Sequence, residues 1–161
     1  MEGSAFEEDG FFRALTTSGA RVLLLGRRAM IALGAPVLTA DYDLWIHPDD
    51  IALLNTAMAP FDLRPNHPPD VARSRGRYVL ENDEHVDVLV APSCSTKDGE
   101  PVAFDDVWAR RRIVQYRGGE SVAVPCIEDL IQTKRWSMRP KDLADIELLK
   151  TLKLEEEEEE S

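Results

Sequence analysis

The stretch T-A-D-Y-D-L-W-I, residues 39–46, carries two aspartates one residue apart inside an apolar run. On a β-strand alternate side chains leave the same face, so Asp41 and Asp43 would point in the same direction. Their Cα atoms would lie about 6–7 Å apart, given the rise of a strand. Two carboxylates held this close repel each other unless a positive group lies between them. The stretch therefore predicts a strand whose polar face needs a positive partner.

A third carboxylate lies in a second apolar run. H-V-D-V-L-V, residues 85–90, is typical of a strand, and N-D-E joins it to R-Y-V-L-E, residues 77–81, as a hairpin. Asp87 is costly to bury in such a strand without a partner. If this hairpin pairs beside the strand at 39–47, the three aspartates form an oxygen cage suited to a hard divalent cation such as Mg²⁺.

Each aspartate also has a structural interpretation. Asp41 could cap the start of its strand, Asp43 could face solvent, and Asp87 could pair with an arginine. Structural ion pairs of this kind are common. The combination of all three with the glycine turn upstream favours a site.

Strand and helix signals along the chain predict a single α/β domain over residues 1–154. R-V-L-L-L (21–25) predicts a buried strand that ends at Gly26, and a helix over 27–33 follows at once. The proline-rich residues 60–75 predict a loop with one short strand at 61–64. The other expected elements are helices at 6–18, 47–58, 103–110, 127–136 and 140–152, and a hairpin at 112–116 and 121–125. The expected fold is a mixed, twisted sheet flanked by helices, with two helices at its C-terminal end.

The net charge of −11 is concentrated in the final residues. Glu155–Glu160 supply six negative charges, and without them the net charge is −5. A run of like charges is usually solvated, so residues 155–161 are expected to form a disordered acidic tail, with a docking tail as the alternative. The acidity of the remainder argues against nonspecific binding to duplex nucleic acid. Local arginine clusters still allow a basic groove for a nucleotide or an RNA end: Arg73, Arg75 and Arg77, and Arg110, Arg111 and Arg112.

Targeting signals and cysteine usage indicate a cytoplasmic protein. No apolar run reaches the ~18–20 residues of a membrane span. The acidic first ten residues lack the apolar segment of a secretory signal. Cys94 and Cys126 have no metal-ligand spacing and are expected to be free thiols.

Histidines and aromatic residues offer weaker candidates. His47, His67 and His85 lie on separate expected elements without metal-ligand spacing, although His85 could assist the neighbouring aspartate. Tyr42 or Trp136 could stack on a base, but packing in the core is the simpler interpretation.

Three of these stretches together resemble the nucleotidyltransferase superfamily of the DNA polymerase β type. They are L-L-L-G-R (23–27), D-Y-D-L (41–44) after a spacer of thirteen residues, and V-D-V (86–88). Members carry an apolar residue, Gly, then Gly or Ser, a spacer of about nine to thirteen residues, Asp-x-Asp/Glu, and a third carboxylate on a later strand.

Within this superfamily the chain resembles small bacterial nucleotidyltransferase-like proteins linked to toxin–antitoxin and abortive-infection systems. The similarity lies in G-R-R-A-M-I-A-L-G-A-P-V-L-T-A-D-Y-D-L (26–44) and in I-E-D-L-I-Q-T-K-R-W-S-M-R-P-K-D-L-A-D-I-E-L-L (127–149). It covers about residues 20–150.

The resemblance implies roles for the three carboxylates and for the glycine. Asp41 and Asp43 would hold Mg²⁺, or Mn²⁺ in its place. Asp87 would be the third ligand and the base for an incoming hydroxyl. Gly26 would let the backbone approach a triphosphate at a helix N-terminus.

Basic residues of the C-terminal segment would complete the site. Lys134, Arg139 and Lys141 would face the nucleotide or a second substrate. Alternatively, these cations are solvated or pair with Asp142 and Asp145.

Two positions depart from the family pattern. Arg27 stands where the motif has Gly or Ser; it could bind phosphate, or it could fill the nucleotide site and abolish activity. Val37 replaces the arginine usual before T-x-D-x-D and removes a positive group from the approach to the carboxylates.

The resemblance implies an enzyme that moves a nucleoside monophosphate from an NTP to a hydroxyl. The acceptor could be an RNA end such as a tRNA 3′ end, a protein, or a small molecule such as an aminoglycoside. A cognate toxin or antitoxin is a further expected partner, and no membrane is expected. The alternatives are a catalytically inactive nucleotide-binding or antitoxin-type interaction protein, and a purely structural interaction domain.

Overall fold

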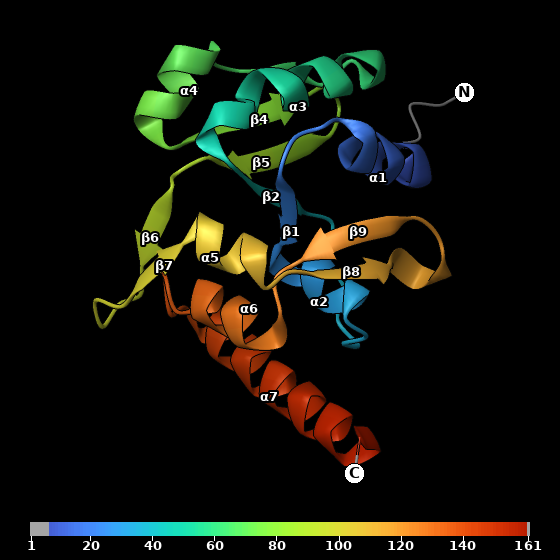
Figure 1. Ribbon diagram of the computed structural model, residues 1–161, viewed down its shortest axis with the longest axis vertical. Helices are drawn as coiled ribbons and strands as arrows, with labels where there is room; N and C mark the ends of the chain where they lie inside the picture. The colour runs from blue at the N-terminus through green and yellow to red at the C-terminus, as the bar shows by residue number, and fades with distance from the viewer. Residues whose placement is uncertain (1–6, 161) are drawn as a thin grey trace.

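The computed structural model describes residues 7–160, and its centre is a five-stranded mixed sheet (Figure 1). The strands lie in the order β1-β2-β5-β4-β3. The pairing of β2 with β5 is parallel, and the pairings of β1 with β2, β5 with β4 and β4 with β3 are antiparallel. The bounds are Val22–Leu25 for β1, Tyr42–Ile46 for β2, Arg64–Pro65 for β3, Arg77–Glu81 for β4 and His85–Leu89 for β5.

Helices and two hairpins surround this sheet. In Figure 1, α3 and α4 lie above it, and α6 and α7 lie below it. The helices are α1 (Glu8–Thr17), α2 (Gly26–Ala32), α3 (Ile51–Met58), α4 (Pro69–Arg75), α5 (Phe104–Ala109), α6 (Ile127–Lys134) and α7 (Pro140–Glu160). The hairpins pair β6 (Ser93–Ser95) with β7 (Pro101–Ala103), and β8 (Arg112–Gln115) with β9 (Ser121–Val124).

The larger hydrophobic core lies on one face of the five-stranded sheet. Tyr42 and Leu44 of β2 and Val86 and Val88 of β5 are buried there, together with the apolar sides of α1 and α3. Since side chains alternate along a strand, the residues between them point to the opposite face. Burial of this apolar set therefore fixes the direction of Asp43 and Asp87.

A smaller core cluster lies on that opposite face. Trp45, Leu23 and Leu25 pack there against Phe104 and Val107 of α5. The indole N–H of Trp45 donates to the carbonyl of Ala91 at 2.8 Å. Asp43 shares the face of Trp45, so the carboxylates emerge beside an apolar cluster that supports β2.

The mixed α/β fold with C-terminal helices that the sequence predicts is confirmed. The strands expected at 77–81 and 85–90 are β4 and β5, and β5 pairs beside β2 as the carboxylate hypothesis requires. The helix expected at 6–18 is α1, and Phe6 lies outside the described residues.

The expected loop at 60–75 is wrong in part. The short strand lies at Arg64–Pro65 rather than at 61–64, and residues 69–75 form α4. Pro68 and Pro69 occupy the cap and the first position of this helix, where an N–H has no partner within the helix. The prolines that indicated a loop therefore begin a helix.

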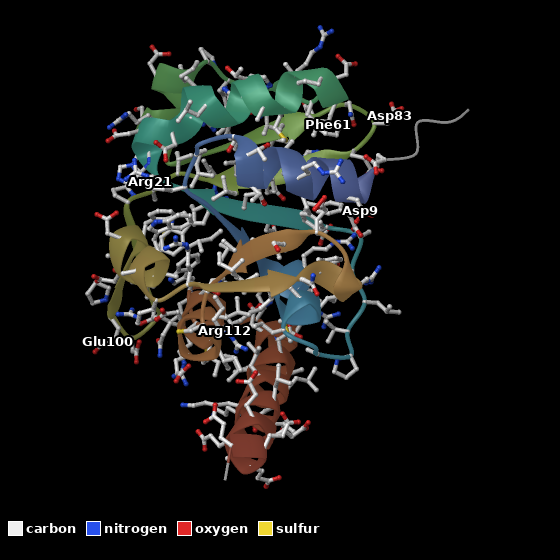
Figure 2. The ribbon with its side chains drawn as sticks, turned by 45° about the vertical axis from the view of Figure 1, so that its right-hand side comes forward. Asp9, Arg21, Phe61, Asp83, Glu100 and Arg112 are labelled. Atoms are coloured by element: carbon white, nitrogen blue, oxygen red, sulfur yellow. The ribbon has the colours of Figure 1, made fainter. Side chains whose placement is uncertain are left out.

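The glutamate run is helical and is not the disordered tail that its charge predicts. Glu155–Glu160 continue α7. Figure 2 labels Arg112 at the start of β8, and its Nη1 lies 3.1 Å from Oε2 of Glu156. Nζ of Lys153 lies 3.3 Å from Oε2 of Glu128. Glutamate has good helix propensity, and the contact with Arg112 connects the acidic end of α7 to β8.

Membrane-spanning helices and the state of the cysteines can be examined in the described part of the chain. Within residues 7–160, no helix combines the length and the apolar character needed to cross a membrane. Cys94 and Cys126 are free thiols, as predicted.

Candidate functional site

Asp43 of β2 and Asp87 of β5 are direct neighbours across the parallel strand pair. Adjacent strands lie about 4.8 Å apart, so the two carboxylates leave one face of the sheet side by side. Asp43 is half-buried, whereas the Asp87 side chain is 59% exposed. One carboxylate is therefore set into the protein and the other is accessible.

The electrostatic environment of Asp43 is unfavourable for its charge. Burial raises the pKa of Asp43 above the usual aspartate value, and the charges of Asp87 and Asp41 raise it further. Lys134 and Lys141 lower the pKa without cancelling the rise. A cation placed between the carboxylates would relieve this repulsion.

Gly26 brings the backbone into contact with the same carboxylate. It follows β1 directly and has φ +64°, in the left-handed region that favours glycine. A Cβ at this position would lie 2.6 Å from Oδ2 of Asp43, closer than real Cβ contacts come. The absence of a side chain at Gly26 thus keeps the space above Asp43 open.

Asp41 contributes charge from the margin of the site. It precedes the first residue of β2 and is exposed. Its backbone is held at both ends: the N–H donates to Thr39 Oγ1 at 3.0 Å, and the carbonyl accepts from Arg28 Nε at 3.0 Å. The effect of Asp41 on the pKa of Asp43 places its charge within reach of the pair.

These carboxylates fit a divalent cation that arrives with a substrate. Within residues 7–160, no three His, Cys, Asp or Glu side chains are gathered closely enough to hold a metal by themselves. Mg²⁺ in proteins usually keeps several waters and binds one or two carboxylates plus substrate phosphates. The in-register pair of Asp43 and Asp87, with the raised pKa of Asp43, suits that mode.

The aspartate pair lines a cleft of about 740 Å³. The β1 arm of the cleft contains Gly26, Lys134 and Arg139. The charges of Lys134 and Arg139 interact with that of Asp43, which locates these cations on its side. The β4 arm contains Asn66, His67, Arg75 and Arg77, which come from the side of the sheet beyond β5.

A buried carboxylate fixes Lys134 at the cleft wall. Nζ of Lys134 lies 3.0 Å from Oδ2 of Asp145, and Nη2 of Arg27 lies 3.1 Å from Oδ1. Asp145 is fully buried and Lys134 is 9% exposed. One carboxylate of α7 thereby joins α2 to the end of α6.

Arg27 lies outside the residues that line the cleft. Besides Asp145, its guanidinium donates to the carbonyl of Leu38 at 3.3 Å. The side chain is thus directed along α2 toward α7 and the 38–39 segment, and the hypothesis that Arg27 fills the nucleotide site has no support in this geometry.

Asp142 holds Arg139 in a comparable way. Asp142 is buried and accepts hydrogen bonds from Nε of Arg139 at 3.0 Å and from Oγ of Ser137 at 2.7 Å. Burial opposes ionisation of Asp142, but these hydrogen bonds outweigh it and hold its pKa below the usual value. The two aspartates of R-P-K-D-x-x-D thus position the cations of the β1 arm.

Sequence reasoning named Arg75 and Arg77 as part of a basic cluster but did not place them beside the aspartates, and it missed Asn66. Arg75 and Arg77 flank the turn between α4 and β4, and Asn66 and His67 follow β3. Trp136 lines the cleft, and its buried indole N–H has no hydrogen-bond partner within residues 7–160. An unpaired buried donor is costly unless a ligand accepts from it.

The tyrosine and two of the histidines named from the sequence have different environments in the structure. Tyr42 faces the larger core and donates its hydroxyl to Glu8, so packing is its role. His47 lies between Asp49 and Asp105, 3.7 Å from each carboxylate. His85 is exposed, with Nε2 3.7 Å from Oδ1 of Asp87, and stays a candidate assistant to it.

Solved structures resemble the fold of this chain, whereas neither a family model nor a curated protein sequence matches it. A Thermotoga maritima protein assigned as a nucleotidyltransferase has a TM-score of 0.56 and 17% identity, covering 92% of this chain and 89% of its own. The lincomycin-bound lincosamide antibiotic adenylyltransferase LnuA has a TM-score of 0.63 and 12% identity, with 93% and 99% covered. The antibiotic-resistance factor ANT(2″)-Ia has a TM-score of 0.60 and 14% identity, with 88% and 80% covered.

These identities are too low to carry an activity from one chain to another, but the likeness extends over nearly the whole chain. The chain therefore has the nucleotidyltransferase fold.

Proposed function

We propose that the protein transfers a nucleoside monophosphate from an NTP to an acceptor hydroxyl and releases pyrophosphate. The observation that carries the proposal is the register of Asp43 with Asp87 beside Gly26, on the floor of an open cleft with basic residues in both arms. The fold neighbours include two named antibiotic-modifying or antibiotic-resistance proteins, which supports nucleotidyl transfer as the general chemistry.

The NTP would occupy the β1 arm. Its phosphates would lie over Gly26, where the missing side chain leaves room beside Asp43. Lys134 and Arg139 would supply positive charge along the phosphates, each oriented by a buried aspartate. Arg27 would act through Asp145, as a positioning residue for Lys134, and not by direct contact with phosphate.

The three aspartates would hold the divalent cation and the acceptor. Asp41, Asp43 and Asp87 are the proposed ligands of Mg²⁺, or of Mn²⁺ in its place. When bound, the ion neutralises phosphate charge and lowers the barrier to displacement of pyrophosphate. Asp87 is more accessible than Asp43. Its carboxylate would orient the acceptor hydroxyl and accept its proton. Catalysis would come mainly from positioning and charge complementarity.

A nucleotide-binding protein without transferase activity is the second candidate. The position of Asp41 favours it, because Asp41 lies before β2 and is not gathered with the other two carboxylates into a preformed cage. Such a protein would bind NTP without releasing pyrophosphate. The antitoxin-type partner implied by the sequence resemblance belongs with this candidate.

Calorimetric titration of each NTP in the presence of MgCl₂ tests the proposal. At least one NTP is expected to bind with metal dependence, and Asp43→Asn/Asp87→Asn is expected to abolish that binding. Asp83→Asn is the matched control, because Asp83 lies in the turn between β4 and β5 at the edge of the molecule (Figure 2). Absence of NTP binding by the unmodified protein would contradict both candidates. Binding without any pyrophosphate release across acceptors of several classes would leave the second.

A further inference from the structure

The β4 arm of the cleft carries two arginines that the protein itself does not neutralise. Arg75 ends α4 and Arg77 begins β4, with Gly76 between them at φ +81°. Both side chains are exposed and line the cleft. Within residues 7–160, neither makes a hydrogen bond or an ion pair. Their charge is available to a ligand.

The neighbouring cations are occupied, which makes this pair distinctive. Nη2 of Arg73, in the same helix, lies 2.6 Å from Oδ1 of Asp49. In the β1 arm, Lys134 is paired with a buried aspartate, as is Arg139. Exposed arginines are common, but two unpaired ones facing one cleft raise the local positive potential and attract anions.

The register of the sheet relates these arginines to the accessible carboxylate. Asp87 pairs with Val79, and Arg77 pairs with Leu89, so Arg77 and Asp87 share one face of the sheet. Arg77 is one strand away from Asp87 and two residues along, which corresponds to about 8 Å between their Cα atoms. An anionic group bound at Arg77 would therefore be separated from a hydroxyl at Asp87 by about the length of one sugar ring.

The same order of strands separates this anion site from the proposed NTP phosphates. Gly26 and β1 lie on one side of the β2–β5 pair, and β4 lies on the other. An NTP seated over Gly26 leaves the β4 arm empty. We infer that the β4 arm binds an acceptor that carries a phosphate group beside its reactive hydroxyl, with Arg75 and Arg77 as the phosphate ligands. The inference rests on the proposed transferase function and names the substrate class of its second site.

The reaction balances with this acceptor. The acceptor hydroxyl oxygen forms a bond to the α-phosphorus of the NTP, the bond from that phosphorus to the bridging oxygen breaks, and pyrophosphate leaves. The hydroxyl proton passes to the Asp87 carboxylate. Asn66 and His67 supply polar groups at the outer end of the same arm. A polycationic aminoglycoside would meet two uncompensated arginines there and would be repelled.

Binding of defined probes to the full chain tests the inference. The protein, saturated with Mg²⁺ and a non-hydrolysable analogue of the preferred NTP, is titrated with ribose 5-phosphate, ribose, a tetraribonucleotide and kanamycin. Ribose 5-phosphate or the tetraribonucleotide is expected to bind at least tenfold more tightly than ribose and kanamycin. Binding of both phosphorylated probes identifies a small phosphorylated acceptor, and binding of the tetraribonucleotide alone identifies a nucleic-acid end.

Arg75→Gln/Arg77→Gln should weaken the phosphorylated probe by about tenfold or more and leave the binding of the NTP analogue within about twofold. For a tetraribonucleotide, the slope of log K against log salt should fall by about 0.7, since the two arginines share one phosphate and each neutralised phosphate on a single strand contributes about 0.7. Arg73→Gln is the matched control, from the same helix but paired with Asp49 and outside the cleft lining. Its affinity for the probe should equal that of the unmodified protein.

Ribose binding as tight as that of both phosphorylated probes, tighter binding of kanamycin, or a probe affinity that survives the double substitution would overturn the inference. Failure of the proposed function has a different signature. It appears as loss of metal-dependent NTP binding or of pyrophosphate release in the unmodified protein, measured before any acceptor probe is added.

Discussion

A Cβ atom at position 26 would lie 2.6 Å from Oδ2 of Asp43, so the glycine and the aspartate are fitted to each other. The φ of +64° at Gly26 turns the chain from β1 directly into α2. The same turn places the backbone against the half-buried carboxylate. The position is therefore constrained twice, by backbone conformation and by the space that Asp43 requires.

Gly26→Ala is expected to destabilise the protein and to abolish metal-dependent NTP binding. The left-handed conformation costs a non-glycine residue about 1–2 kcal/mol, and the new methyl group must also displace the Asp43 carboxylate. Urea unfolding and calorimetry would measure the two effects. Gly118→Ala is the control, because Gly118 has φ +74° with nothing within 4 Å of an added Cβ. It should lose similar stability and keep NTP binding; if both variants keep binding, the fit between Gly26 and Asp43 has no functional role.

Asp43→Asn is expected to stabilise the metal-free protein at neutral pH. Because the pKa of Asp43 is raised in the folded state, the folded protein binds this proton more tightly than the unfolded chain. Stability is therefore lost as the pH rises from the usual aspartate range through the raised pKa, and the deficit is complete above it. Removing a like-charge cross-strand pair should contribute about 0.5–1 kcal/mol, or about 1–4 °C in Tm.

Thermal unfolding in EDTA at several pH values would show this effect. The gain of Asp43→Asn should be full at pH 7.5 and should shrink as the pH falls toward 4. Asp83→Asn, in the exposed turn, should show no such trend. A gain that is independent of pH would mean that repulsion at Asp43 is not its source.

Arg27→Met and Lys134→Met are expected to be strongly non-additive. Each single substitution leaves Asp145 one cationic partner and should cost about 1–3 kcal/mol. The double substitution leaves a fully buried carboxylate unpaired, which costs more than the sum of the two. A double-mutant cycle by urea unfolding measures the coupling. Simple additivity would show that Asp145 does not depend jointly on the two cations.

The acidic end of α7 should be stabilised by reversing its charge. Negative side chains at a helix C-terminus oppose the helix dipole and repel one another at i,i+4. Glu159→Lys/Glu160→Lys is expected to increase helical circular dichroism at low salt, and the increase should shrink in 1 M NaCl. The control, Asp83→Lys/Glu100→Lys, makes the same change in net charge at two turns away from α7 (Figure 2). An equal effect of both pairs would assign the change to net charge alone.

The sequence predicts the aspartate pair because the relevant physics is local. In D-Y-D-L-W-I and H-V-D-V-L-V, apolar residues alternate with aspartates, and burial of one face fixes the direction of the other. The hairpin at 77–90 follows from turn residues between two strand-like runs. Its placement beside β2 was a condition of the carboxylate hypothesis, since alternation alone does not specify which strands become neighbours.

The sequence indicated the basic cluster that contains Arg75 and Arg77 but not its place beside Asp87, because that place depends on strand order and on the start of α4. Arg75 and Arg77 enter the cleft only when β4 lies beside β5 and the chain turns at Gly76. Pro68 and Pro69 were interpreted as loop signals although both fit a helix start. The β6–β7 hairpin was missed since three-residue strands, one of them beginning with proline, show too little alternation.

The sequence left the ionic contacts within the C-terminal segment undecided. Lys134 and Arg139 were expected either to face the nucleotide or to be solvated or pair with nearby aspartates. The structure shows both aspartate pairs. Arg27 and Asp145 are 118 residues apart in the sequence, so no local sequence pattern indicates their contact. Its interpretation as a phosphate ligand came from the family motif.

The contact of Arg27 with Asp145 also bears on the order in which the protein assembles. Translation delivers α2 long before α7, so a growing chain that has already formed β1 and β2 carries Arg27 without its buried partner. Asp43 and Asp87 both precede α6 and α7 in the chain, whereas Lys134 is held in place by a residue that is made after it. The cleft is therefore complete only when α7 has docked, because the last long helix carries the carboxylate that holds Lys134.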